Sequence, residues 1–312
     1  MKCSYHAGYQ PPLPPGHPFP VSKYPLLRDL LVREGVVREQ DLAEPAPAER
    51  EALALVHTPR YLEQLANGDF SPAEIRRLGM PWSEALWLRS RLAVGGTLQG
   101  ARAALADGIG ANLAGGTHHA FADHGEGFCV VNDVAVATRQ LREAGAIRRA
   151  VIVDLDVHQG NGTARIFEAE RDVLTFSMHG ERNYPREKMR SSLDLGLADG
   201  TGDQEYLATL ERVLPQVLDA AGADLAFYLA GVDVAAGDRY GRLALSEQGI
   251  RARDRTVVEL VRGRGIALAI VLAGGYAATR ERTAELHAHV FREAAAYESG
   301  LRPPSIRPPS GP

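Results

Sequence analysis

The segment from Ala150 to Gly162 holds the densest group of chemically capable residues in this sequence. An apolar run, Ala-Val-Ile-Val, passes without a break into Asp154, Asp156 and His158, and Gly-Asn-Gly follows. In an extended chain, side chains two residues apart project from the same face. Two carboxylates and an imidazole that converge at the end of a strand predict a site for a divalent metal, either Zn²⁺ or another first-row ion.

Short apolar runs that end in polar or glycine-rich residues recur along the rest of the chain, with helix-like segments between them. Strands are predicted at residues 109–113, 150–155, 173–177, 225–230 and 267–272. Helices are predicted at residues 22–35 with Ser22 as N-cap, 48–56, 59–66, 83–106, 132–144, 203–220 with an interruption near Pro215, and 246–264. This alternation is typical of an α/β fold whose mainly parallel sheet is covered on both faces.

The composition describes an ordinary globular chain of 312 residues, with 45% hydrophobic and 24% charged residues and a net charge of −4. This charge gives no reason to expect nucleic-acid binding, and no apolar run approaches the ~20 residues of a membrane span. Cys3 and Cys129 form no Cys-x-x-Cys pair, and the N-terminus lacks the apolar core of a signal peptide, so a cytoplasmic protein is expected. The oligomeric state stays open.

No linker-like change in composition divides the chain. We therefore expect one domain over residues 1–299, followed by a tail at residues 300–312 that is rich in Pro and Ser and loosely ordered.

The polar residues gather at the carboxyl ends of the predicted strands, where open α/β sheets bind ligands. His118 and His119 follow the first of these strands, Asp233 follows the fourth, and Gly-Gly-Tyr276 follows the fifth. Each of them alone is readily explained as a helix cap, a hydrogen-bonded pair or a packed aromatic. Buried charges at several neighbouring strand ends would be costly without a shared ion, so the joint pattern favours a site.

These groups suit one reaction. Asp156, His158 and Asp233 would be three metal ligands and would leave an open position for water and substrate. A metal there lowers the pKa of bound water and polarises a carbonyl. One or both of the adjacent histidines would take the proton of the water and return it to a leaving amine, and Tyr276 would donate to the oxyanion. The pattern predicts metal-assisted amide hydrolysis without a covalent intermediate.

Motifs along most of the chain resemble the histone deacetylase family, most closely its bacterial and class IV-like members. They are Lys2-Cys-Ser-Tyr-His-Ala-Gly, Val56-His-Thr-Pro-Arg-Tyr-Leu, Gly115-Gly-Thr-His-His-Ala, Gly127-Phe-Cys-Val-Val-Asn-Asp, Asp154-Leu-Asp-Val-His-Gln-Gly-Asn-Gly-Thr, Ala230-Gly-Val-Asp and Leu272-Ala-Gly-Gly-Tyr. The resemblance implies a single-domain, three-layer arginase/deacetylase-type fold with about eight strands in a central, mainly parallel sheet. It also implies a metal at the carboxyl edge of that sheet.

The resemblance assigns roles to individual residues. It makes Asp156, His158 and Asp233 the metal ligands, His119 the general base and acid, His118 its electrostatic partner, and Tyr276 the residue that stabilises the oxyanion. It makes Asp154 the residue that orients His118, and Asn161 the residue that orients His119. The family often has Asp at the latter position, so a neutral Asn should support a less basic imidazole.

The resemblance also implies a tunnel for an acyl-lysine side chain and a structural monovalent cation, usually potassium. The tunnel would be walled by Phe128 and Tyr184 and kept narrow by Gly127 and Gly275. Groups near Asp154, Asp156, His158, Ser177 and Met178 would hold the cation.

Two positions depart from the family pattern. Gln159 replaces the second His of a common His-His-Gly run; because it follows the ligand, metal binding should survive. The segment Arg77-Leu-Gly-Met-Pro-Trp82 has no acid where the larger deacetylases place a carboxylate that grips the substrate backbone. This argues against peptide-backbone recognition and histone-like substrates.

We therefore predict a zinc-dependent deacylase that removes an acetyl or longer acyl group from an acylated lysine or a related amine, with Fe²⁺ as the alternative metal. An acetylpolyamine amidohydrolase is the first alternative. It would need a carboxylate near the tunnel mouth, for which Asp123, Glu126 and Glu181 are the candidates. A catalytically silent binder of acylated ligands is a further alternative, and an arginase-like binuclear site would need additional carboxylates. The acyl length depends on the depth of the tunnel's foot.

Overall fold

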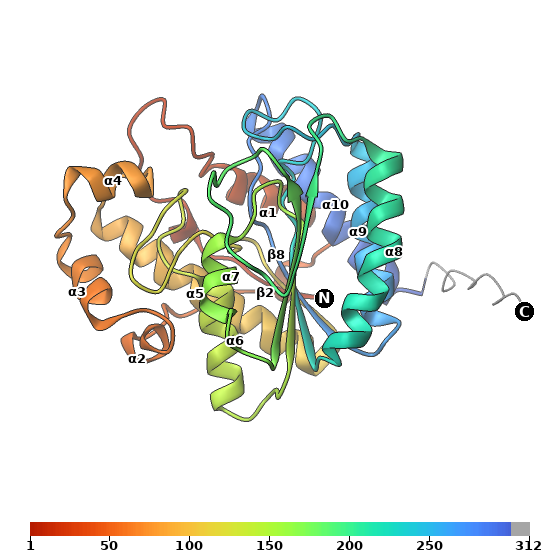
Figure 1. The fold of residues 1–312 in the computed structure, drawn as a ribbon, viewed down its shortest axis with the longest axis horizontal. Coiled ribbons are helices and arrows are strands. Elements are labelled where there is room, and N and C mark those ends of the chain that lie inside the picture. Colours follow the sequence, from red (N-terminus) through yellow and green to blue (C-terminus); the bar gives the residue numbers. More distant parts are fainter. Residues whose placement is uncertain (301–312) are drawn as a thin grey trace, which may run out of the picture.

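The computed structural model of the protein describes residues 1–300, in which one sheet of eight parallel strands lies between two layers of helices (Figure 1). The order of the strands across the sheet is β2-β1-β3-β8-β7-β4-β5-β6, and every neighbouring pair is parallel. The strands are β1 (Lys2–Ser4), β2 (Leu42–Ala43), β3 (Ile109–Asn112), β4 (Ala150–Asp154), β5 (Val173–Gly180), β6 (Leu193–Leu197), β7 (Leu225–Leu229) and β8 (Ala267–Val271). The predicted fold class is confirmed.

Ten α-helices and two short 3₁₀ turns surround this sheet within the described part of the chain. The helices are α1 (Lys23–Arg33), α2 (Arg50–Ala54), α3 (Pro59–Asn67), α4 (Pro72–Leu78), α5 (Glu84–Asp107), α6 (Asp133–Glu143), α7 (Asn161–Phe167), α8 (Asp203–Ala221), α9 (Glu247–Arg262) and α10 (Arg280–Glu298). Helices α5, α6 and α7 cover one side of the sheet, and α8 and α9 cover the other (Figure 1). Helix α1 packs against α10, and α10 packs against α9.

The central strands are buried along their whole length, as their apolar sequences predict. Every residue of β4, β7 and β8 is buried, which is expected for parallel strands with a helical layer on each face. Register places Asp154, the last residue of β4, beside Leu229 of β7 on one side and Ser177 of β5 on the other. The carboxyl ends of these strands therefore meet at one edge of the sheet and bring their following loops together.

Several sequence predictions for the elements are wrong. Helix α8 continues through Pro215 without the predicted interruption. Pro lacks the N–H that would bond to the carbonyl of Glu211, but Glu211 is exposed, so water can hydrate that carbonyl. Ser22 does not cap α1, because its own backbone is helical and its side chain accepts no capping hydrogen bond.

The sequence prediction also missed β2, β6, α4, α7 and α10, of which α10 is the longest at 19 residues. Apart from Gly300, the expected tail lies outside the described residues. Among residues 1–300, no helix combines the length and the apolar character needed to cross a membrane.

Candidate active site

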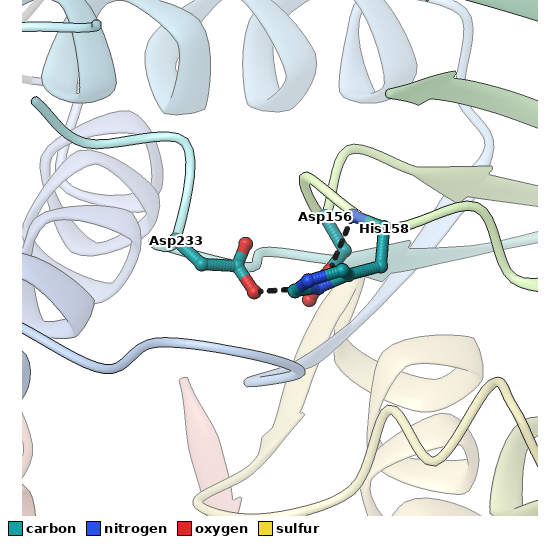
Figure 2. A group of neighbouring side chains, drawn as sticks. All are labelled: Asp156, His158 and Asp233. Atoms are coloured by element: carbon teal, nitrogen blue, oxygen red, sulfur yellow. Dashed lines mark hydrogen bonds and ion pairs between the residues drawn. The ribbon is translucent and has the colours of Figure 1, made fainter. Parts of the chain in front are cut away.

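Two carboxylates and one imidazole converge at the carboxyl edge of the sheet (Figure 2). Asp156 and His158 lie in the loop after β4, and Asp233 lies in the loop after β7, the strand next to β4. One ligand atom from each residue lies within 4.8 Å of the other two, and all three residues are buried. The predicted convergence is present, but its proposed cause is wrong for two residues. The strand ends at Asp154, so loop geometry and not a shared strand face brings Asp156 and His158 together.

The hydrogen bonds of this group leave one carboxylate oxygen without a partner. Asp156 accepts from the backbone N–H groups of His158 at 2.9 Å and Gly274 at 2.6 Å, and Asp233 Oδ1 accepts from Val157 N at 2.9 Å. Asp233 Oδ2 is buried and has no hydrogen-bond partner, although it lies 3.2 Å from His158 Nδ1. A buried, unpaired carboxylate oxygen is costly, so this position favours a cation.

The pKa values of Asp233 and His158 also favour a cation at this position. Burial and, after it, the Asp156 carboxylate raise the pKa of Asp233 to about 7. Burial alone would lower the pKa of His158, but the nearby Asp156 and Asp233 carboxylates raise it to about 10. The group is therefore most stable with a shared positive charge. Two carboxylates and an imidazole form a donor set that fits a first-row divalent ion, so the residues present can hold the metal that the sequence predicts.

Gly274 is required by its close approach to this group. A Cβ atom at position 274 would lie 1.9 Å from Asp233 Oδ2 and 2.6 Å from Asp156 Oδ2, so any side chain would displace both carboxylates. Its backbone N–H is also one of the donors that hold Asp156. Gly275, which we expected to narrow the tunnel, does not line the cavity. A Cβ atom there would meet Val232, His287 and Thr283, so Gly274 is the glycine that faces the site.

His118 and His119 follow β3 and lie side by side, with their ring centroids 4.1 Å apart. His118 Nδ1 lies 2.7 Å from Asp154 Oδ2, and His119 Nδ1 lies 2.7 Å from Asn161 Oδ1. Burial alone would lower the pKa of His118, but Asp154 and Asp156 outweigh burial and raise it to about 9. Burial and the two neighbouring imidazoles hold the pKa of His119 well below its ordinary value. The pair therefore combines one charged and one neutral imidazole.

Glu126 takes part in this network, which sequence reasoning did not foresee. Asn161 Nδ2 donates to Glu126 Oε1 at 2.6 Å while Asn161 Oδ1 faces His119. Because a carboxylate can only accept, it orients the amide, and the amide oxygen in turn requires a proton on His119 Nδ1. Nε2 of His119 then keeps its lone pair. Nothing in the sequence links positions 126 and 161, so no spacing signal could have shown the contact.

A cavity of about 320 Å³ is lined by two of the three ligands, Asp156 and His158, and by both histidines and Tyr276. Phe128, Tyr184 and Gly127, which the resemblance places around a tunnel, are among the residues that line it. Tyr184 is 43% exposed and marks the mouth, whereas Tyr24 and Arg89 are buried and mark the floor. A Cβ atom at Gly127 would lie 2.7 Å from His119 Cδ2, which explains the need for a glycine beside the imidazole.

The Tyr276 hydroxyl is a free donor at this cavity. It makes no hydrogen bond to any residue that the structure describes, and its ring packs edge-on against Tyr240 with the centroids 4.9 Å apart. Burial raises its pKa well above the ordinary value, and the Asp233 and Asp156 carboxylates raise it further. The hydroxyl therefore keeps its proton.

The mouth of the cavity is basic. Arg76 and Arg77, in the last turn of α4, line it, and neither side chain forms an ion pair or hydrogen bond within residues 1–300. None of the three acidic candidates for the mouth lines the cavity. Glu126 is engaged by Asn161, and Asp123 is engaged by His124 at 2.8 Å.

The strand ends expected to hold a monovalent cation are adjacent. Asp154 and Ser177 are cross-strand neighbours, and Met178 is the next residue of β5. Ser177 Oγ lies 2.9 Å from His179 Nδ1, and Asp154 Oδ1 accepts from the backbone N–H of Asp156 at 3.1 Å. Asp154, Ser177 and Met178, three of the residues that the resemblance groups around this cation, thus lie next to one another.

Comparison with known proteins decides the family. Residues 17–294 match the histone deacetylase domain family. The chain belongs to the histone deacetylase family. It is 31% identical to Histone deacetylase 2 of Arabidopsis thaliana over 83% of this chain and 70% of that protein. It is 46% identical to an uncharacterised protein of Picosynechococcus, over 88% of this chain and 91% of the other.

Further matches agree with this family. A histone deacetylase-like amidohydrolase of Pseudomonas aeruginosa is 28% identical over 86% of this chain and 74% of the other. The crystal structure of the HDA15 HD domain superposes with a TM-score of 0.79 at 23% identity, and the match covers 98% of this chain and 91% of that one. This superposition confirms the arginase/deacetylase fold that we expected.

Proposed function

We propose that the protein is a zinc-dependent deacylase that hydrolyses the amide of an acylated lysine or a related acylated amine. The observation that carries the proposal is one cavity lined by Asp156 and His158 of the three-ligand group, by the His118–His119 pair and by Tyr276, with Asp233 buried beside the first two. Fe²⁺ is the alternative ion because the same donor set suits it. A monovalent cation beside Asp154 and Ser177, proposed as potassium, would neutralise charge at the carboxyl edge of the sheet.

The side chains divide the reaction between them. Asp156, His158 and Asp233 would hold the metal, which when bound supplies Lewis acidity toward the carbonyl and toward a water molecule. His119 accepts the proton of the attacking water at Nε2 and returns it to the leaving amine. His118 stays protonated beside Asp154 and offsets the negative charge that develops. The Tyr276 hydroxyl donates to the oxyanion.

The basic mouth favours an acyl-lysine over an acetylated polyamine. A polyamine carries ammonium groups beyond the scissile amide, and these would lie near Arg76 and Arg77, where no Asp or Glu is among the described residues that line the mouth. We expect the zinc-reconstituted protein to hydrolyse acyl-lysine peptides at least about 10-fold more efficiently than acetylspermidine, as kcat/KM. Turnover of no acylated substrate by protein with bound metal would contradict the proposed reaction, and a preference for acetylspermidine would contradict only the choice of substrate.

Glu126 offers a test of how His119 is held. Glu126→Ala removes the acceptor that orients the Asn161 amide, so we expect kcat to fall by about 10- to 100-fold, the range for partners of catalytic groups. Glu126→Gln can still accept from Asn161 and should stay within about 3-fold of the wild type. Metal content should not change in either variant. Equal rates for Glu126→Ala and the wild type would show that Asn161 needs no such support.

A further inference from the structure

Two arginines are buried in the described part of the chain, Arg89 and Arg253, and their surroundings differ. Arg253 forms an ion pair with Asp254 at 2.8 Å and donates to the carbonyl of Gly231 at 2.5 Å. Arg89, on α5, makes one hydrogen bond, from Nη2 to the Tyr24 hydroxyl at 2.8 Å. Its Nε is buried without a partner, and no carboxylate among residues 1–300 pairs with it. A guanidinium carries five N–H donors, so Arg89 has donors left over for a ligand.

Arg89, whose Nε lacks a protein partner, is one of the residues that line the cavity. It lines the same cavity as Asp156 and His158 and is buried, whereas Tyr184 at the mouth is 43% exposed. Its guanidinium carbon lies 5.5 Å from the ring centroid of Phe19 and 5.7 Å from that of Tyr24, which also line the cavity. The two rings hold the group in place and offer it cation–π contact, but neither supplies a negative charge.

Asp133, a buried carboxylate on this side of the sheet edge, is already satisfied. It accepts hydrogen bonds from Thr97 Oγ1 at 2.5 Å, from Gly116 N at 3.1 Å and from both Thr117 N and Oγ1, at 2.8 and 2.5 Å. It does not lie within ion-pair distance of Arg89. Lys23, a second buried cation nearby, donates to Ala273 O at 2.9 Å and does not line the cavity. Arg89 is therefore the cation that faces the floor.

We propose that Arg89 binds a carboxylate at the far end of the substrate's acyl chain, so that the site takes acyl groups of dicarboxylic acids such as succinyl or glutaryl. This inference rests on the proposed deacylase function. An acyl-lysine that enters at the mouth places its carbonyl at the ligands and directs its acyl chain to the floor, where Arg89 lies. A planar carboxylate matches the fork of N–H donors on a guanidinium, and a buried pair of this kind is strong when each group is hydrogen-bonded.

The test compares one peptide that carries acetyl-, pentanoyl-, succinyl- or glutaryl-lysine, with the zinc-reconstituted protein. We expect the wild type to prefer succinyl or glutaryl over pentanoyl by at least about 10-fold in kcat/KM. Arg89→Met keeps the bulk and removes the charge, and should lose about 30-fold on the dicarboxylic substrate, the size expected for a charge-assisted hydrogen bond. Its loss on acetyl-lysine, which has no terminal carboxylate, should be smaller than its loss on the dicarboxylic substrate. Arg102→Met, an exposed position without partners on the same helix, is the matched control.

Two results would overturn the assignment. One is turnover of acetyl- but not succinyl- or glutaryl-lysine, and the other is an equal loss on charged and neutral acyl groups in Arg89→Met. Arg89→Lys keeps the positive charge and should retain part of the preference for dicarboxylic over neutral acyl groups. This variant replaces Arg89→Met in the test if the Met variant does not fold.

A binding measurement separates failure of this inference from failure of the deacylase function. If no peptide is hydrolysed, thermal unfolding of the metal-free protein still tests whether Arg89 binds a carboxylate. Glutarate or succinate should raise the Tm of the wild type but not that of Arg89→Met. An equal shift in both proteins, or a shift with acetate as large as that with glutarate, would overturn the role of Arg89.

Discussion

Phenylalanine at position 276 should lower kcat by about 100- to 1000-fold, the cost of removing one donor to an oxyanion. The hydroxyl is protonated, faces the cavity and has no partner among residues 1–300, so its hydrogen bond is available to the transition state. The rest of the side chain should stay in place. Its backbone N–H donates to Asp238 Oδ2 at 2.7 Å, and its ring packs against Tyr240 and Phe128.

Steady-state kinetics and metal analysis on the same preparations check this expectation. KM should change little, because an interaction made only in the transition state leaves substrate binding intact. The metal content of Tyr276→Phe should equal that of the wild type. Tyr297→Phe, which removes a hydroxyl from α10 outside the cavity, is the control. An unchanged kcat in Tyr276→Phe would remove the oxyanion role from this residue.

The central strands could be predicted from the sequence because burial on both faces makes their apolar runs continuous. Ala150–Asp154 and Ala267–Val271 end within a residue of their predicted bounds. Edge strand β6 gives no such signal, since Leu193 is exposed and only Leu197 is buried. Helix α10 was missed because Ala, His and Glu residues mix on its buried side and blur the apolar stripe that indicates a helix.

The membership of the site could be predicted because the chain places its polar residues directly after buried strands. Parallel strands bring those positions to one edge, so sequence order alone groups His118, Asp156 and Asp233. Contacts made by other elements could not be predicted. Glu126 meets Asn161 across 35 positions of sequence, and Arg89 looks like an ordinary helical arginine until its burial is seen.

Alanine at position 233 should abolish stoichiometric metal binding and hydrolysis, because it removes one of the three ligands. We expect at most about 1% of wild-type kcat. Asp233 accepts one backbone hydrogen bond, from Val157 N, whereas Asp156 accepts two, from His158 N and Gly274 N. Asp233 Oδ2 has no hydrogen-bond partner, and burial raises the pKa of Asp233 to about 7. A variant without this carboxylate should therefore fold, and the metal-free Tm of Asp233→Ala should be no more than a few degrees below that of the wild type.

Added metal should distinguish the two proteins. A ligand at 100 times its Kd stabilises the folded state by about 2.7 kcal/mol, so zinc should raise the Tm of the wild type and a chelator should reverse the shift. Neither should affect Asp233→Ala. Asp69→Ala removes an exposed carboxylate that is not one of the three ligands, and it should respond to zinc as the wild type does. Full metal occupancy in Asp233→Ala would show that the ligand set is wrong, and loss of metal without loss of hydrolysis would show that the reaction needs no metal at this site.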